Sequence, residues 1–224
     1  MAVITDTERA SAAASRLLRD GEACFVGIGM PSLAALLAKH THAPRLALVY
    51  ESGAYGTVPP ALPMSTGSPS VAQGAACIGD CSLVFGDLQA GRIDVGLLSA
   101  AQVDRRGNLN STVIGDYRHP KVRLVGSGGA HDIASLAGRT VIVMPHDPRR
   151  FVERVDFVTA PGLGDDGRRP QGTRGAGPVA LVTPRATFGF SSGEMTLEAV
   201  HEGFTADEAI EGFGWSVPQA EHLA

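Results

Sequence analysis

Short apolar runs alternate with amphipathic stretches along the first half of the chain. Apolar positions recur at helical spacing over residues 5–19, and Thr5 or Asp6 can cap the start of that helix. Residues 24–27 predict a strand, residues 31–40 a helix that Pro31 opens, and residues 46–50 a second strand. This order predicts parallel strands in a sheet that helices cover.

The second half of the chain continues with strands and then changes to hairpins. Three apolar runs predict further strands, at residues 93–100, 140–144 and 155–159. Residues 131–136 predict a helix, whereas the run at 81–85 fits either a helix or a strand. Runs around a Ser192-Gly193 turn predict antiparallel hairpins, and Thr205 caps a last helix. The predicted fold class is therefore α/β: an open, mainly parallel sheet flanked by helices, with C-terminal antiparallel hairpins.

Glycine clusters add the positions of tight turns to this outline. Glycine supplies 28 of the 224 residues, well above the usual ~7%, and many of these glycines follow apolar runs directly. A glycine after a strand lets the backbone turn tightly or approach a ligand. Residues 162–178 hold six glycines and three arginines in seventeen positions. We expect a flexible loop there, inside a single domain that spans residues 1–224.

Charge and cysteine content exclude several classes of function. The 19 Lys and Arg residues against 23 Asp and Glu residues give a net charge of −4, so no bulk basic field favours nucleic acid or an anionic membrane. Three cysteines, an odd number, are typical of a reducing compartment. With no signal-peptide pattern and no long apolar run, we expect a cytoplasmic protein. Histidine and cysteine spacing predicts no metal site.

Glu51 is the strongest candidate for a chemical role. It follows the apolar run at residues 46–50 directly, and Ser52, Gly53 and Gly56 come next. Ligands of open α/β sheets bind at the carboxyl ends of the strands. A poorly hydrated carboxylate is a better nucleophile or base than one in bulk water. The pattern alone fits a helix-capping or surface glutamate equally well.

A second glycine cluster could supply hydrogen-bond donors. The segment 126–129, Gly-Ser-Gly-Gly, precedes a predicted helix and offers backbone N–H groups to a phosphate or an oxyanion, with Gly126, Gly128 and Gly129 as the candidates. It lacks the dinucleotide-binding spacing and the Walker lysine, so a plain strand-to-helix turn is the alternative. The cationic pairs Lys121 with Arg123 and Arg149 with Arg150 are either phosphate contacts or solvated surface charge.

Taken in order, these motifs resemble the β subunit of family I coenzyme A transferases, the group containing glutaconate and 3-oxoacid CoA-transferases. The glutamate motif reads Tyr50-Glu51-Ser52-Gly53-Ala54-Tyr55-Gly56, and matching segments follow at 91–96, 100–108, 115–116, 126–130 and 193–195. The resemblance runs from about Ala23 to Trp215. The string at 115–121 is most similar to a branch that opens rings of steroid-derived acyl-CoA thioesters by hydrolysis.

The resemblance implies a function for Glu51 and for its neighbours. Glu51 would attack an acyl-CoA thioester and end as a glutamyl-CoA thioester, from which a second carboxylic acid takes the CoA. Backbone N–H groups from Gly53 to Gly56, and others from a partner chain, would stabilise the oxyanion. Coenzyme A would be a substrate, and no cofactor is expected. A separate α subunit is also implied, in a heterodimer or a heterotetramer.

Two alternative functions stay open from the sequence. The first is an acyl-CoA hydrolase on the same fold, in which water replaces the second acid or a partner-chain carboxylate acts as base. The second is a non-catalytic scaffold subunit whose site lies in the α chain. Glu51 argues against the scaffold, because an inert subunit needs no carboxylate beside two close-approach glycines.

Overall fold

The computed structural model describes residues 4–223. Its helices are α1 (Asp6–Ser15), α2 (Met30–His40), α3 (Cys81–Gln89), α4 (Ala130–Leu136) and α5 (Ala206–Ile210), with short 3₁₀ turns η1 (Pro69–Ala72) and η2 (Pro148–Arg150). Its strands are β1 (Ala23–Val26), β2 (Ala47–Val49), β3 (Ala54–Tyr55), β4 (Cys77–Ile78), β5 (Val95–Leu98), β6 (Gln102–Val103), β7 (Leu109–Asn110), β8 (Val113–Gly115), β9 (Pro120–Arg123), β10 (Arg139–Val143), β11 (Pro178–Val182), β12 (Ala186–Gly189) and β13 (Thr196–Val200). None of the helices within residues 4–223 is long and apolar enough to cross a membrane.

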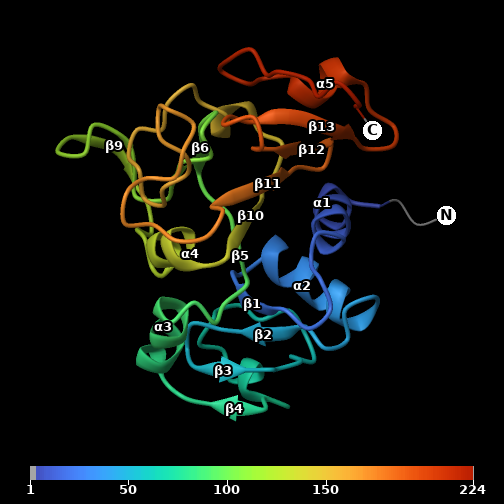
Figure 1. The fold of residues 1–224 in the computed structure, drawn as a ribbon, viewed down its shortest axis with the longest axis vertical. Coiled ribbons are helices and arrows are strands. Elements are labelled where there is room, and N and C mark those ends of the chain that lie inside the picture. Colours follow the sequence, from blue (N-terminus) through green and yellow to red (C-terminus); the bar gives the residue numbers. More distant parts are fainter. Residues whose placement is uncertain (1–3, 224) are drawn as a thin grey trace.

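A nine-stranded sheet organises the described chain, in the order β13-β12-β11-β10-β5-β1-β2-β3-β4 (Figure 1). The five central strands, β11 to β2 in that order, pair in parallel. The strands beyond them at either edge pair antiparallel, β12 and β13 on one side and β3 and β4 on the other. The predicted parallel sheet with C-terminal hairpins is confirmed. The antiparallel edge formed by β3 and β4 was not predicted.

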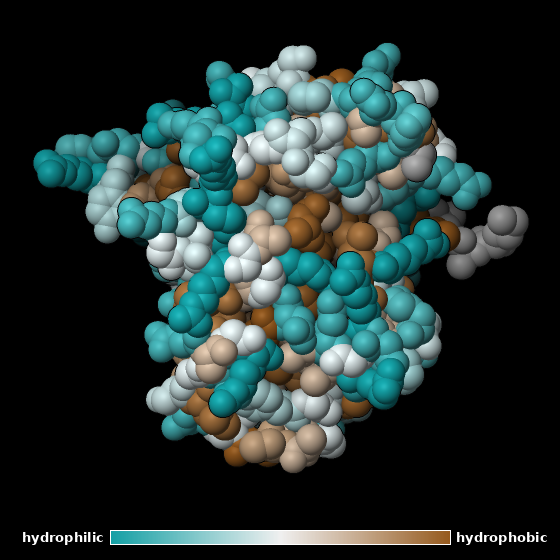
Figure 2. All heavy atoms as spheres, viewed as in Figure 1, coloured by the Kyte–Doolittle hydropathy of each residue, from teal (hydrophilic) through white to brown (hydrophobic). Residues whose placement is uncertain are grey.

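Helices cover both faces of the sheet, and the alternation of side chains along each strand matches this arrangement. Helices α1 and α2 pack together on one face, and α3 and α4 lie on the other (Figure 1). Along β1, Cys24 and Val26 join the core beneath α1 and α2, while Phe25 joins the core beneath α3 and α4. Because successive strand side chains point to opposite faces, four consecutive apolar residues are what a doubly covered strand requires. Hydrophilic residues cover most of the surface in Figure 2, and hydrophobic ones show in a hollow near its middle and on the surface at the lower edge, where β4 lies.

The predicted helix starts are confirmed by their caps. The Thr5 hydroxyl accepts a bond from the Glu8 N–H at 3.2 Å, and the Glu8 carboxylate accepts one from the Thr5 N–H at 2.8 Å. This reciprocal pair of hydrogen bonds is a capping box, and Thr205 and Glu208 form another at the start of α5. Each box satisfies N–H groups that have no partner inside a helix. The ambiguous run at 81–85 is helical, since the Asp80 carboxylate accepts the Leu83 N–H and starts α3.

The strand predicted at residues 155–159 is wrong. The segment is irregular with bends, and one isolated bridge joins Ala160 and Leu109 beyond its end. Its side chains bind other loops instead of a sheet: the Phe157 ring stacks on Tyr117, and the Thr159 hydroxyl accepts the Ser111 N–H at 2.9 Å. The apolar alternation therefore reflects packing between loops, which gives the same pattern as a half-buried strand.

Residues 162–178 follow the irregular course expected of them and are fixed at several points. The Arg169 guanidinium donates to the carbonyl groups of Gly162 at 2.7 Å and Ala134 at 2.6 Å. At Gly175, which has φ +63°, a β-carbon would lie 2.2 Å from the Ala137 carbonyl oxygen. Glycine is required there because another backbone occupies the side-chain position. The contacts anchor the segment, and its flexibility stays a prediction.

Candidate functional site

Glu51 lies where the carboxyl ends of the central strands meet. It follows β2, while Gly27 follows β1 and Ser99 follows β5, the two strands next along the sheet. All three residues line one cavity of about 220 Å³. The chain runs from β1 outward to β2 and then returns to the other side of β1 as β5, so this cavity sits at a point where the strand order reverses. Such points are the usual ligand sites of open α/β sheets.

A tight turn fixes the Glu51 backbone. The Tyr50 N–H donates to the Ala54 carbonyl at 2.9 Å, and the Gly53 N–H donates to the Tyr50 carbonyl at 2.9 Å. Gly53 has φ +108°, and a β-carbon on it would lie 2.3 Å from the Gly79 carbonyl oxygen. The glycine thus allows β3 to turn back closely and holds Glu51, which is half-buried, at the cavity.

Ser52 and Gly56 have structural contacts in the described chain. The Ser52 hydroxyl donates to the Thr66 carbonyl at 2.6 Å and thereby holds the loop at 57–72 against the cavity, which Thr66 also lines. The Gly56 N–H donates to the Leu48 carbonyl at 2.8 Å. The N–H groups of Gly53 and Gly56 are therefore already engaged within the chain. An oxyanion role for residues 53–56 stays a prediction.

The second glycine cluster reaches the same cavity in part. Gly128 and Gly129 line it together with Ser127, and a β-carbon on Gly129 would lie 3.6 Å from the Glu51 Oε1 atom. The N–H groups of Gly128 and Gly129 donate to no acceptor within residues 4–223. Gly126 is not among the cavity residues, and its N–H donates to the Ser111 carbonyl at 2.8 Å. The structure thus brings two of the three predicted glycines to Glu51.

Within residues 4–223 the Glu51 carboxylate is unpaired at the cavity. Its carboxylate forms no ion pair and accepts no hydrogen bond from any residue that the structure describes. Apolar residues such as Phe25 and Leu97 also line its cavity, and Gly129 lies close to the carboxylate. A carboxylate with few donors keeps its lone pairs available for an electrophile. The two unused N–H groups nearby could donate hydrogen bonds to the negative charge that forms on a carbonyl oxygen.

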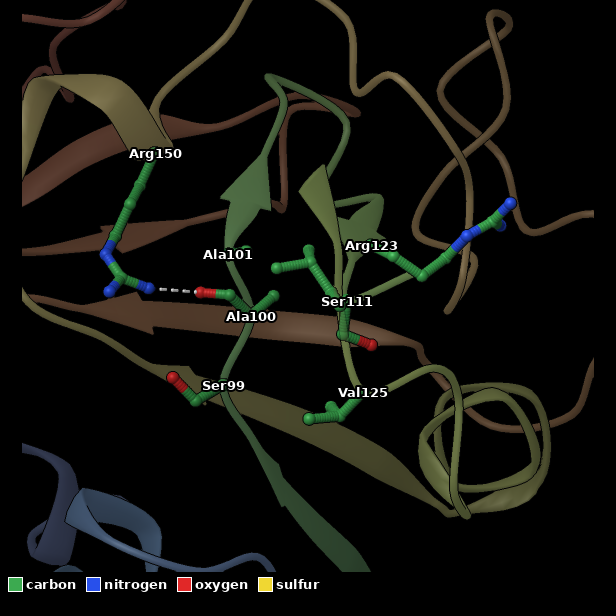
Figure 3. Close-up of a pocket in the computed structure, with 8 residues that line it drawn as sticks. Ser99, Ala100, Ala101, Ser111, Arg123, Val125 and Arg150 are labelled. Carbon is green, nitrogen blue, oxygen red and sulfur yellow. Dashed lines mark hydrogen bonds between the residues drawn. The ribbon is translucent and has the colours of Figure 1, made fainter. Parts of the chain in front are cut away.

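A larger cavity of about 620 Å³ adjoins the first, since Ser99 lines both. Ala100 and Ala101 continue from Ser99 along one wall, and the Arg150 guanidinium enters from the other side (Figure 3). Ser99 was not predicted as a site residue. Its position directly after an apolar strand, like that of Glu51 after β2, is the signal that could have found it.

The other predicted cations, Arg149, Arg123 and Lys121, are paired, lie over an aromatic ring or are exposed. Arg149 pairs with Asp147 at 2.7 Å at the surface, and this guanidinium lowers the pKa of Asp147 to about 2. Arg123 lies over the Tyr117 ring at 5.0 Å, and Lys121 is exposed on the same hairpin. Neither lines the Glu51 cavity. Within residues 4–223 no group of three or more His, Cys, Asp or Glu side chains could hold a metal ion.

The string at 115–121 forms the turn of the β8–β9 hairpin, which projects from the body of the molecule (Figure 1). The Asp116 carboxylate accepts the N–H groups of Arg118 at 2.9 Å and His119 at 2.8 Å, so it shapes the turn. None of these residues lines the Glu51 cavity.

Comparison with known proteins places the chain in a family. A model of the coenzyme A transferase family matches residues 7–212. A 3-oxoadipate CoA-transferase chain of Pseudomonas knackmussii is 43% identical over 100% of this chain and 88% of its own length. The crystal structure of glutaconate coenzyme A-transferase from Acidaminococcus fermentans superimposes with a TM-score of 0.89 at 32% identity, covering 98% of this chain and 88% of that one. The IpdB chain of the cholesterol ring-cleaving hydrolase of Mycobacterium bovis is a more distant relative, 29% identical over 95% of this chain and 85% of its own. The resemblance of the motifs is thereby confirmed: this chain belongs to the coenzyme A transferase family and is similar throughout to its β subunits.

Proposed function

We propose that this chain carries the nucleophile of a CoA-transferase, and that this nucleophile is Glu51. The observation that carries the proposal is the unpaired Glu51 carboxylate in a cavity that unused N–H groups of Gly128 and Gly129 also line. The acceptors and donors of CoA are carboxylic acids and their thioesters. The relatives named for 3-oxoadipate and glutaconate support short dicarboxylic acids as the substrate class.

The geometry supports covalent catalysis in two half-reactions. A Glu51 oxygen attacks the thioester carbonyl, the C–S bond breaks, and an acyl-glutamyl anhydride forms with free CoA thiolate. The thiolate then attacks the glutamyl carbonyl, which releases the first carboxylate and leaves Glu51 as a CoA thioester. A second carboxylate reverses these steps and leaves as the new acyl-CoA. Dividing the exchange in this way replaces one difficult step with easier ones.

The oxyanion of each tetrahedral intermediate needs donors that are fixed before reaction. The N–H groups of Gly128 and Gly129 meet this need, because they donate to nothing within residues 4–223 and belong to the turn before α4. The N–H groups of Gly53 and Gly56 have acceptors in the chain. We therefore assign the oxyanion role to the second cluster and the positioning role to the first.

A partner chain is part of this proposal. The relatives are β-type subunits of CoA-transferases, and we propose that an α-type chain completes the site in a heterodimer or heterotetramer. Coenzyme A acts as a substrate, and the chemistry requires no resident cofactor. The free thiols of Cys24, Cys77 and Cys81 support a cytoplasmic location.

The central test is chemical trapping of the intermediate. The chain is co-produced with its α-type partner, incubated with acyl-CoA without an acceptor acid, and treated with borohydride, which reduces a glutamyl thioester to the alcohol. Mass spectrometry should place the modification at Glu51. Glu51→Ala should lower transfer at least about 10³-fold. Glu153→Ala, which removes an exposed carboxylate outside the Glu51 cavity, should leave the rate unchanged.

The same experiment distinguishes the alternatives. Free acid released at full rate without an acceptor would show hydrolysis, the activity in the name of the IpdB relative. Full activity of Glu51→Ala would overturn both Glu51-centred mechanisms and favour a scaffold role.

A further inference from the structure

We propose that Arg150 binds the remote carboxylate of a dicarboxylic substrate in the 620 Å³ cavity while Glu51 reacts at the other end. The inference rests on the proposed function, which it deepens by assigning a residue that selects the substrate. The observations that carry it are the contacts of Arg150, the walls of the cavity and its position beside the Glu51 cavity, with which it shares Ser99.

Arg150 is a half-buried cation without a counterion. Its Nη1 atom donates to the Ala100 carbonyl at 2.6 Å, which fixes the guanidinium at the cavity (Figure 3). No carboxylate within residues 4–223 comes within ion-pair distance, and the Nε atom is buried without an acceptor. The adjacent Arg149, by contrast, is paired with Asp147 and is 89% exposed. A partly desolvated charge without a partner is unfavourable, so an anion that enters the cavity gains from pairing with it.

The cavity walls suit a hydrocarbon chain that ends in an anion. Apart from Arg150, they are made mainly of small or aliphatic side chains: Ala100, Ala101, Leu124 and Val125. Arg123 also lines the cavity, but its guanidinium lies over the Tyr117 ring and points away from Arg150 (Figure 3). The volume falls in the usual range for small-molecule sites. The cavity therefore presents one available guanidinium among apolar surfaces.

The spacing of the strands sets the length of the substrate. Ala100 follows β5 and Glu51 follows β2, and β1 lies between these strands. Strands lie about 4.8 Å apart, so the two strand ends are about 10 Å apart. The substrate also needs a contact distance to the protein at each of its ends. The length that remains corresponds to a substrate of roughly four to six carbons. Ser99 lines both cavities and therefore lies where they meet.

The first test uses the unaltered αβ complex and compares acceptor acids of equal length. Adipate should be used at least about 30-fold more efficiently, in kcat/KM, than hexanoate or the monoamide of adipic acid. Equal efficiencies would overturn the assignment while leaving Glu51 chemistry intact. Failure to transfer CoA to any acid would instead overturn the proposed function, and the assignment with it.

The second test removes the charge at Arg150. Arg150→Gln should reduce kcat/KM for adipate about 30-fold or more and change that for hexanoate less than about threefold. Arg154→Gln is the matched control, since it removes an exposed charge outside the cavity and leaves the Arg149–Asp147 pair intact, and it should leave the ratio of the two acids unchanged. An equal loss for both acids would show that Arg150 binds a CoA phosphate or supports the fold, and would contradict the proposal.

Discussion

At the scale of single residues, Glu51 owes its position to its neighbours more than to contacts of its own. Its carboxylate has no partner among residues 4–223, whereas Gly53 and Ser52 are tightly bonded to the chain around it. The proposed nucleophile is not held by hydrogen bonds of its own and must therefore be placed by its backbone. The glycine turn is therefore the part of the site that tolerates change least.

Substitution of Gly53 should demonstrate this requirement. In Gly53→Ala, the β-carbon would overlap the Gly79 carbonyl, and φ +108° is strained for any side chain. We expect a loss of about 3 kcal/mol or more in the free energy of unfolding, measured by urea denaturation, together with loss of transfer activity.

Gly74 supplies the control for this substitution. It also has a positive φ, of +67°, but nothing lies within 4 Å of its β-carbon position. Gly74→Ala should therefore cost only about 1 kcal/mol. Equal losses in the two variants would contradict the role given to the contact between Gly53 and Gly79.

At the scale of elements, the sequence predicted the helices and strands that local patterns determine. It did not predict the features that depend on contacts between distant residues. The capped helices and the apolar strands β1, β2, β5 and β10 were predictable because capping residues and continuous apolar runs are local features of the sequence. The segment at 155–159 was not, because its apolar residues pack on loops. Glu51 was found as a residue that follows a strand. Arg150 was found only as one of two adjacent arginines, since the pairing of Arg149 with Asp147 decides which of them is available.

The loop at 162–178 provides a prediction at this scale. The Arg169 guanidinium has a pKa lowered by burial and donates to three carbonyl groups, those of Pro161, Gly162 and Ala134. Arg169→Met keeps much of the volume but leaves these acceptors unsatisfied. Each lost bond costs of order 1 kcal/mol, so we expect a destabilisation of about 2–3 kcal/mol in urea denaturation. Arg168→Met, at the exposed neighbouring position, should change stability little.

At the scale of the whole molecule, one sheet joins segments that are far apart in the sequence. Strands β1, β2 and β5 bring residues near positions 27, 51 and 99 to one edge, and the η2 turn after β10 brings Arg150 to the Ala100 carbonyl. Helices on both faces fix the strands, so the ligand edge is the part of the central sheet left uncovered for chemistry. The C-terminal segment closes one end of this arrangement through a cluster of aromatic rings. There His146, which follows β10, lies near Phe151 and Phe213.

That cluster makes the stability of the whole fold depend on pH. Burial lowers the pKa of His146 below its ordinary 6.5; its Nε2 atom bonds the Glu211 carbonyl at 2.9 Å, and its Nδ1 atom is buried without a partner. A proton on Nδ1 would place a charge there with no acceptor, so the unfolded chain binds protons more readily than the folded one. Stability should therefore be complete above about pH 6.5 and fall as the pH drops below that value.

Urea denaturation at pH 7.5 and pH 5.0 measures this effect. The difference in unfolding free energy between the two pH values should be smaller in His146→Gln than in the unaltered protein. In His222→Gln it should be unchanged, because His222 is exposed and forms no hydrogen bond or ion pair with the described residues. Since burial also lowers the pKa of His201, His146→Gln should retain part of the dependence, and the double variant with His201→Gln should lose more of it. An undiminished dependence in the double variant would show that carboxylates, rather than these two imidazoles, control stability between the two pH values.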